Sequence, residues 1–123
     1  MAVILYIEDN FENRLLVNRI LTAEGHTVLE AEDGPEGLAV AARQALDLVL
    51  VDINLPEMDG YEVTSRLREM ASMEKVPIVA LTANVLRGDR ERSLGAGCDG
   101  YIQKPLDVDM LPTQIQTFLE QAN

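Results

Sequence analysis

Four stretches of the chain consist mostly of apolar residues, and each is followed by polar or charged residues. They are residues 3–7 before Glu8 and Asp9, residues 48–51 before Asp52, residues 78–81 before Thr82, and residues 101–103 before Lys104 and Pro105. Uninterrupted runs of Val, Ile and Leu are typical of strands that are buried on both faces of a parallel sheet. Residues 27–31 predict one further strand. The pattern therefore predicts five strands.

Segments with helical periodicity separate these strands. The residues at helical spacing are Phe11, Leu15, Leu16, Ile20 and Leu21 in the first segment; Leu38, Ala41, Ala42 and Ala45 in the second; Val63, Leu67 and Met70 in the third; and Leu111, Ile115, Phe118 and Leu119 in the last. In the second segment they predict the inner face of the helix. Asn10 is a good N-cap for the first helix, and Gly25 ends it. Residues 87–94 predict a short, very polar helix.

The alternation of strands and helices predicts an α/β fold that forms one domain over residues 1–123. Right-handed crossovers would place helices on both faces of a parallel sheet. Periodicity does not determine the strand order, and the flavodoxin-like order 2-1-3-4-5 is one of two common options. In either order the carboxyl ends of the strands form the ligand crevice, so the polar residues that follow the strands would gather there.

Net charge, cysteine content and the length of the apolar stretches limit which partners and which location the protein can have. A net charge of −11 argues against binding to nucleic acid or to an anionic membrane surface, although acidity of this kind also serves solubility. Cys98 is the only cysteine, so no internal disulfide can form, and a reducing compartment is expected. No apolar stretch approaches the roughly 20 residues of a membrane span, and the N-terminus lacks the basic segment of a signal peptide. We expect a cytoplasmic protein.

Three of the polar residues at the strand ends are acids. Glu8 and Asp9 leave the first strand, and Asp52 ends the third. Two carboxylates about 4 Å apart repel each other by about 4 kcal/mol at an effective dielectric constant near 20, so such a cluster needs a cation. Ligands that are all oxygen favour Mg²⁺ or Mn²⁺. Taken singly, Asp9 as a helix cap and Asp52 as a solvated residue are the simpler readings; together they predict a metal site.

The same strand ends provide the groups for phosphoryl transfer. Asp52 can act as a nucleophile and form an acyl phosphate. Lys104 can hold a phosphoryl oxygen as a point charge, and Thr82 offers a hydroxyl donor. Threonine is common at strand ends and most lysines are solvated, so these two residues gain weight only from their shared location.

Four segments in combination resemble the receiver domain of bacterial response regulators. They are residues 7–10 (Ile-Glu-Asp-Asn), 51–60 (Val-Asp-Ile-Asn-Leu-Pro-Glu-Met-Asp-Gly), 81–83 (Leu-Thr-Ala) and 101–105 (Tyr-Ile-Gln-Lys-Pro). The resemblance covers essentially the whole chain. It implies the strand order 2-1-3-4-5 with five helices.

The resemblance also implies an acceptor and a metal site. Asp52 would accept the phosphoryl group, and Mg²⁺, with Mn²⁺ as an alternative, would be held by Glu8, Asp9, Asp52 and the backbone carbonyl of Asn54. Many receivers have Asp where this chain has Glu8, an exchange that moves the carboxylate by one methylene.

Four further residues have roles that the resemblance implies. Lys104 would bind the phosphate, Thr82 and Tyr101 would form the switch pair, and Ala83 would join the phosphate-binding set. The bond between Lys104 and Pro105 would be cis, against about 5–6% of X-Pro bonds in general.

A stand-alone receiver of a two-component system or phosphorelay is therefore expected, and its start at Met1 weighs slightly in favour of that reading over a piece of a hybrid kinase. A histidine kinase or a histidine phosphotransfer protein would donate the phosphoryl group. A downstream protein would read the face formed by the fourth helix, fifth strand and fifth helix. We expect a monomer or weak dimer.

Two rival functions are less well supported. A Mg²⁺-dependent phosphatase with an aspartyl phosphate would need a second acid two residues after Asp52, where the chain has Asn54. An inactive docking receiver would lack the acceptor or metal acids. Pro112 leaves one further question open: it is harmless in the first turn if Asp109 is the N-cap, but it removes a backbone bond if the helix starts at Val108.

Overall fold

The computed structural model describes residues 2–83 and 95–121. Its five strands are β1 (Val3–Ile7), β2 (Thr27–Ala31), β3 (Leu48–Asp52), β4 (Ile78–Thr82) and β5 (Gly100–Gln103). All neighbours pair in parallel, in the order β2-β1-β3-β4-β5. The predicted flavodoxin-like order is confirmed.

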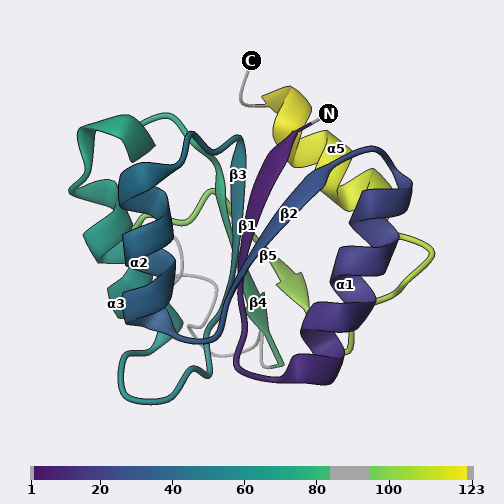
Figure 1. Cartoon of the computed structure of the whole chain (residues 1–123), viewed down its shortest axis with the longest axis horizontal. Coiled ribbons are helices and arrows are strands. Elements are labelled where there is room, and N and C mark those ends of the chain that lie inside the picture. Colours follow the sequence, from purple (N-terminus) through teal and green to yellow (C-terminus); the bar gives the residue numbers. More distant parts are fainter. Residues whose placement is uncertain (1, 84–94, 122–123) are drawn as a thin grey trace.

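Helices cover both faces of this sheet (Figure 1). They are α1 (Phe11–Ala23), α2 (Gly34–Arg43), α3 (Gly60–Arg68), one turn of 3₁₀ helix, η1 (Ala71–Met73), and α5 (Leu111–Gln121). Figure 1 shows α1 and α5 on one face and α2 and α3 on the other. The helix predicted at residues 87–94 lies outside the described residues.

Two apolar clusters form the core, one on each face of the sheet. Because side chains alternate along a strand, Ile4 and Tyr6 of β1 lie in the cluster with α1 and α5, whereas Leu5 and Ile7 lie in the cluster with α2 and α3. All five residues of β3 and all five of β4 are buried. This is why these strands read as continuous apolar runs in the sequence.

The predicted inner face of α2 is confirmed for Ala41, which is buried, and for Leu38, which packs against the core, but it is wrong for Ala42 and Ala45. The buried residues are Gly34, Gly37, Val40 and Ala41, while Ala42 is exposed and Ala45 lies beyond the end of the helix. A Cβ atom on Gly37 would lie 2.4 Å from Cδ1 of Ile7. Glycine therefore lets the helix backbone approach β1, and a search for apolar side chains at helical spacing misses such positions.

The apolar residues of α1 do not all face the core. Val17 and Leu21 are buried and so is Arg14, whereas Leu15, Leu16 and Phe11 are exposed, Phe11 to 64%. The helix packs on the sheet through the face that carries Arg14, Val17 and Leu21. Phe11, Leu15 and Leu16 form a second, apolar face that is exposed.

The last helix begins at Leu111. Pro112 is therefore in its first turn, where a proline removes no helical hydrogen bond. Within the described part of the chain, no helix combines the length and the apolar character needed to cross a bilayer.

Candidate functional site

The carboxyl ends of β1, β3 and β5 bring the predicted charged residues together. Lys104 Nζ lies 2.8 Å from Asp52 Oδ2 and 3.5 Å from Glu8 Oε1. Glu8 and Asp52 are 1% and 2% exposed, while Asp9 is exposed. One carboxylate oxygen from each of Glu8, Asp9 and Asp52 lies within 4.8 Å of the others. The three acids predicted as a group do form one cluster.

Asp52 is held at the end of β3 by its own backbone surroundings. The backbone N–H of Asn54 donates to Asp52 Oδ1 at 3.0 Å, so the Asn54 backbone also lies beside the cluster. The start of α3 packs directly behind, because a Cβ on Gly60 would come within 2.5 Å of the Asp52 carbonyl oxygen. Asp59 caps α3 by accepting from the N–H of Glu62.

Burial and proximity shift the ionisation of this cluster. Burial, followed by the hydrogen bond and charge of Asp52, raises the pKa of Glu8 to about 7, against the opposing charge of Lys104. Burial would also raise the pKa of Asp52, but hydrogen bonds with Glu8 and Lys104 outweigh it and lower that pKa. Burial alone would lower the pKa of Lys104, but the hydrogen bond to Asp52 and the charge of Asp52 outweigh it, so the pKa of Lys104 is raised. Asp52 and Lys104 are therefore an ion pair at neutral pH, and Glu8 holds its proton more tightly than an ordinary glutamate does.

The remaining predicted residues surround this centre. Thr82 is buried at the end of β4, and Ala83 follows it at the surface. Tyr101 is half-buried and pairs in register with Ala80; because Ala80 and Thr82 are two residues apart, Tyr101 and Thr82 lie on the same face of the sheet. The bond between Lys104 and Pro105 is cis.

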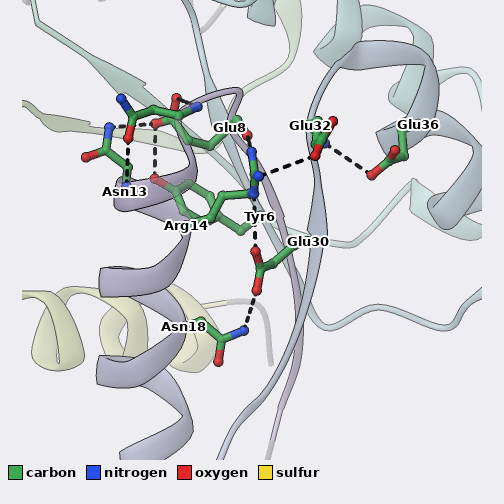
Figure 2. Close-up of polar contacts among 9 residues, drawn as sticks. Tyr6, Glu8, Asn13, Arg14, Asn18, Glu30, Glu32 and Glu36 are labelled. Carbon is green, nitrogen blue, oxygen red and sulfur yellow. Dashed lines mark hydrogen bonds and ion pairs between the residues drawn. The ribbon is translucent and has the colours of Figure 1, made fainter.

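Three residues that contact Glu8 were not singled out from the sequence (Figure 2). The Tyr6 hydroxyl donates to Glu8 Oε1 at 3.1 Å, and Asn13 Nδ2 donates to the same oxygen at 3.3 Å. Arg14 is buried and donates to the Glu8 carbonyl oxygen at 2.7 Å, with its Nε on Glu30 of β2 at 3.2 Å. A tyrosine inside an apolar strand and an arginine on the inner face of a helix were the available signals.

A groove opens next to the cluster. Its volume is about 410 Å³, and its lining residues are Tyr6, Asn13, Leu16, Ala83, Lys104, Pro105 and Leu106. Apolar residues of this groove, among them Leu16 and Leu106, therefore lie beside Lys104, the residue that contacts Asp52. The arrangement offers a buried anionic oxygen, a cation and an approach for a phosphorylated group, which are the elements of phosphoryl transfer onto a carboxylate.

Comparison with known proteins agrees with this chemistry. The family model of the response regulator receiver domain matches residues 4–116. The polar-differentiation response regulator DivK of Brucella anthropi is 35% identical over 119 residues, which cover 97% of each chain.

Solved structures match over nearly the full length as well. The chemotaxis response regulator CheY4 of Vibrio cholerae has a TM-score of 0.92 at 29% identity, covering 96% of this chain and 98% of its own. The receiver domain of a sensor histidine kinase of Pseudomonas aeruginosa has a TM-score of 0.89 at 38% identity, covering 97% and 98%, and its structure holds a magnesium ion in the active-site cleft. The chain therefore belongs to the response regulator receiver family, and it is a phosphorylation-dependent signalling switch of the two-component type rather than a classical enzyme.

Proposed function

We propose that Asp52 is the residue that accepts the phosphoryl group. The observation that carries this proposal is the environment of Asp52: it is 2% exposed, its Oδ2 is 2.8 Å from Lys104 Nζ, and it shares a cluster with Glu8 and Asp9. Its lowered pKa keeps the carboxylate ionised at neutral pH, which is the form that can attack phosphorus. Asp9 is exposed and Glu8 has a raised pKa, so neither acid matches this combination.

Mg²⁺, or Mn²⁺ in its place, would be held by Glu8, Asp9, Asp52 and the backbone carbonyl of Asn54. The residues fit such an ion because three carboxylate oxygens lie within 4.8 Å of one another and the donor set is all oxygen. The magnesium ion in the Pseudomonas receiver supports the assignment. When bound, the ion would neutralise charge on the carboxylates and on the incoming phosphoryl oxygens.

The transfer itself uses the chain's own residues. An Asp52 oxygen attacks the phosphorus of a phosphohistidine, the new O–P bond forms, and the N–P bond breaks with its electron pair going to the imidazole. Lys104 exchanges its contact with Asp52 for a phosphoryl oxygen. Thr82 and Ala83, at the end of β4, complete the phosphate-binding set.

The phosphorylated state would be transmitted through Thr82 and Tyr101. These residues lie on the same face of neighbouring strands, so movement of the Thr82 hydroxyl to the phosphate would leave space for the aromatic ring. The pair would then bias a surface near β5 and α5 between two arrangements. A downstream protein that binds one arrangement better would read the switch.

Family membership implies a histidine kinase as partner. We infer that this kinase, or a histidine phosphotransfer protein, docks on the uncovered apolar face of α1. Phe11, Leu15 and Leu16 are exposed there, and Leu16 lines the same groove as Lys104. A donor that covered these side chains would bring its phosphohistidine to the open side of the site.

The domain boundaries 1–123, the cytoplasmic location, the absence of nucleic-acid and membrane binding, and the monomeric or weakly dimeric state stay predictions. The net charge of −11 still argues against binding to a polyanion.

The acceptor is tested by labelling with a small phosphodonor. Incubation with Mg²⁺ and acetyl phosphate should add one phosphoryl group to the wild-type protein, as measured by intact mass. Asp52→Asn should abolish the addition, whereas the matched control Asp109→Asn, at an exposed position, should retain it. Equal labelling of Asp52→Asn and wild type would contradict the proposal.

A further inference from the structure

Tyr6 brings a hydroxyl group to the acid cluster from inside an apolar strand. The residue is fully buried among the side chains between the sheet and helices α1 and α5. Residues two apart on a strand point to the same face, so Tyr6 and Glu8 extend side by side toward the carboxyl end of the sheet. The hydroxyl meets Glu8 Oε1 at 3.1 Å (Figure 2).

The two oxygens of Glu8 have different surroundings. Three donors converge on Oε1: the Tyr6 hydroxyl, Asn13 Nδ2 at 3.3 Å, and Lys104 Nζ at 3.5 Å. Oε2 accepts one bond, at 3.4 Å, from the backbone N–H of Asn10. An ionised carboxylate has about four acceptor sites. Anchoring Oε1 therefore fixes the plane of the group and leaves Oε2 with acceptor capacity for a cation.

The length of Glu8 makes such an anchor useful. A glutamate has one more rotatable bond than an aspartate, so holding its carboxylate in one place costs more side-chain entropy. The Tyr6 ring is already fixed by packing, and its hydroxyl offers a rigid contact at the level that the longer side chain reaches. An aspartate at position 8 would withdraw its carboxylate by one methylene from this hydroxyl.

We propose that Tyr6 is a positioning residue for Glu8: its buried hydroxyl orients the Glu8 carboxylate as a Mg²⁺ ligand. The inference rests on the proposed function, in which Glu8 binds Mg²⁺. Groups that orient metal ligands through hydrogen bonds commonly change metal affinity by about tenfold or more when they are removed. The alternative is that Tyr6 only fills the core, in which case its hydroxyl would have no effect on metal binding.

The test is a titration of the full, unphosphorylated chain with Mg²⁺. The chemical shifts of the backbone amides, measured by NMR at each Mg²⁺ concentration, give the affinity. Tyr6→Phe removes the hydroxyl and keeps the ring, so it should weaken Mg²⁺ affinity by about tenfold. The same substitution in a Glu8→Asp background should change the affinity by less than about twofold, because the shorter side chain holds its carboxylate out of reach of the hydroxyl. Ile4→Val, on the same face of β1 and equally buried, is the matched control and should also change the affinity by less than about twofold.

A wild-type Mg²⁺ affinity in Tyr6→Phe, or an equal loss in the wild-type and Glu8→Asp backgrounds, would overturn the inference. A second measurement needs no change at Tyr6: in Glu8→Asp alone, the ring signals of Tyr6 should shift because the hydrogen bond is lost, and unshifted signals would count against the inference. Failure of the wild-type protein to bind Mg²⁺ would instead reject the proposed metal site, and the inference with it. Labelling of Asp52 reports on the acceptor separately.

Discussion

Glu8 reduces the stability of the metal-free protein in a way that depends on pH. Its burial beside Asp52 raises its pKa from 4.5 to about 7. An acid with a higher pKa in the folded state binds its proton more tightly when folded. Its stabilising contribution is therefore fully present below pH 4.5 and is lost as the pH rises through about 7. Glu8→Gln removes this titration and keeps an oxygen that can accept from Tyr6 and Asn13.

The expected size of the effect follows from the shift. One pKa unit corresponds to about 1.4 kcal/mol, so Glu8 costs about 3 kcal/mol relative to an uncharged side chain at pH 8, where it is ionised, and about 1 kcal/mol at pH 5, where it takes up a proton on folding. Glu8→Gln should accordingly raise the free energy of unfolding by up to about 3 kcal/mol at pH 8, and by much less at pH 5. The lowered pKa of Asp52 lies below its ordinary value of 3.8, so its titration falls outside this range of pH.

Urea unfolding followed by circular dichroism, with a chelator present, measures this difference at the two pH values. Glu12→Gln, at an exposed position of α1, is the matched control for the loss of one carboxylate. Addition of Mg²⁺ should stabilise the wild-type protein more than Glu8→Gln, because the ion replaces the proton as the partner of the carboxylate. An equal effect of Glu8→Gln at pH 5 and pH 8, or a loss of stability at pH 8, would refute the reasoning.

Three further predictions concern the groups around the site. Arg14→Met should lower the free energy of unfolding, measured by urea denaturation, by about 2 kcal/mol, because the charged donor to the buried carbonyl oxygen of Glu8 is lost. The control Arg19→Met, at an exposed position of the same helix, should change the free energy of unfolding little. Gly60→Ala should lower the free energy of unfolding by about 1–3 kcal/mol by the same method, since the new methyl would lie 2.5 Å from the Asp52 carbonyl oxygen; an unchanged midpoint would contradict this. Leu16→Ser should slow transfer from a phosphorylated histidine kinase by about tenfold and leave labelling by acetyl phosphate unchanged, and slowing of both reactions would argue against docking on α1.

The sequence predicted the sheet well because its central strands are buried on both faces. Such strands must be apolar along their whole length, and this signal does not depend on knowing the partners of each strand. The strand order could not be predicted from periodicity, because periodicity does not encode which strands pair. The order was predicted from the family resemblance instead. The inner face of α2 was predicted only in part: Leu38 and Ala41 do face the core, but Gly34 and Gly37, which have no apolar side chain, are also buried there, and Gly37 packs directly against Ile7 of β1.

The acids of the site were predictable for a similar reason. A polar residue directly after a buried strand has a position that is fixed by the sheet, so Glu8, Asp52 and Lys104 could be placed together before any distance was known. The other residues that contact Glu8 could not be found in this way. Tyr6 sits inside a strand as part of the core, and Arg14 lies in a helix, where an arginine usually faces solvent. Arg14 reaches Glu8 from a different element, and Tyr6 reaches it from two positions earlier in the same segment; neither hydrogen bond could be assigned before the side chains were placed.

If the cluster of acids has the proposed function, function and stability oppose each other at this site. Without a metal, two buried carboxylates share the ammonium of Lys104, and one of them, Glu8, has its pKa raised to about 7 by burial and by the neighbouring Asp52. A phosphoryl group on Asp52 would compete for the same lysine. Neutralising Glu8 should thus stabilise the fold and weaken the proposed switch, whereas substitutions of core residues that do not contact the cluster, such as Ile4→Val, should weaken the fold without changing Mg²⁺ affinity. The two properties can therefore be separated by experiment: a residue belongs to the switch if its replacement changes Mg²⁺ affinity or phosphorylation out of proportion to its effect on the free energy of unfolding.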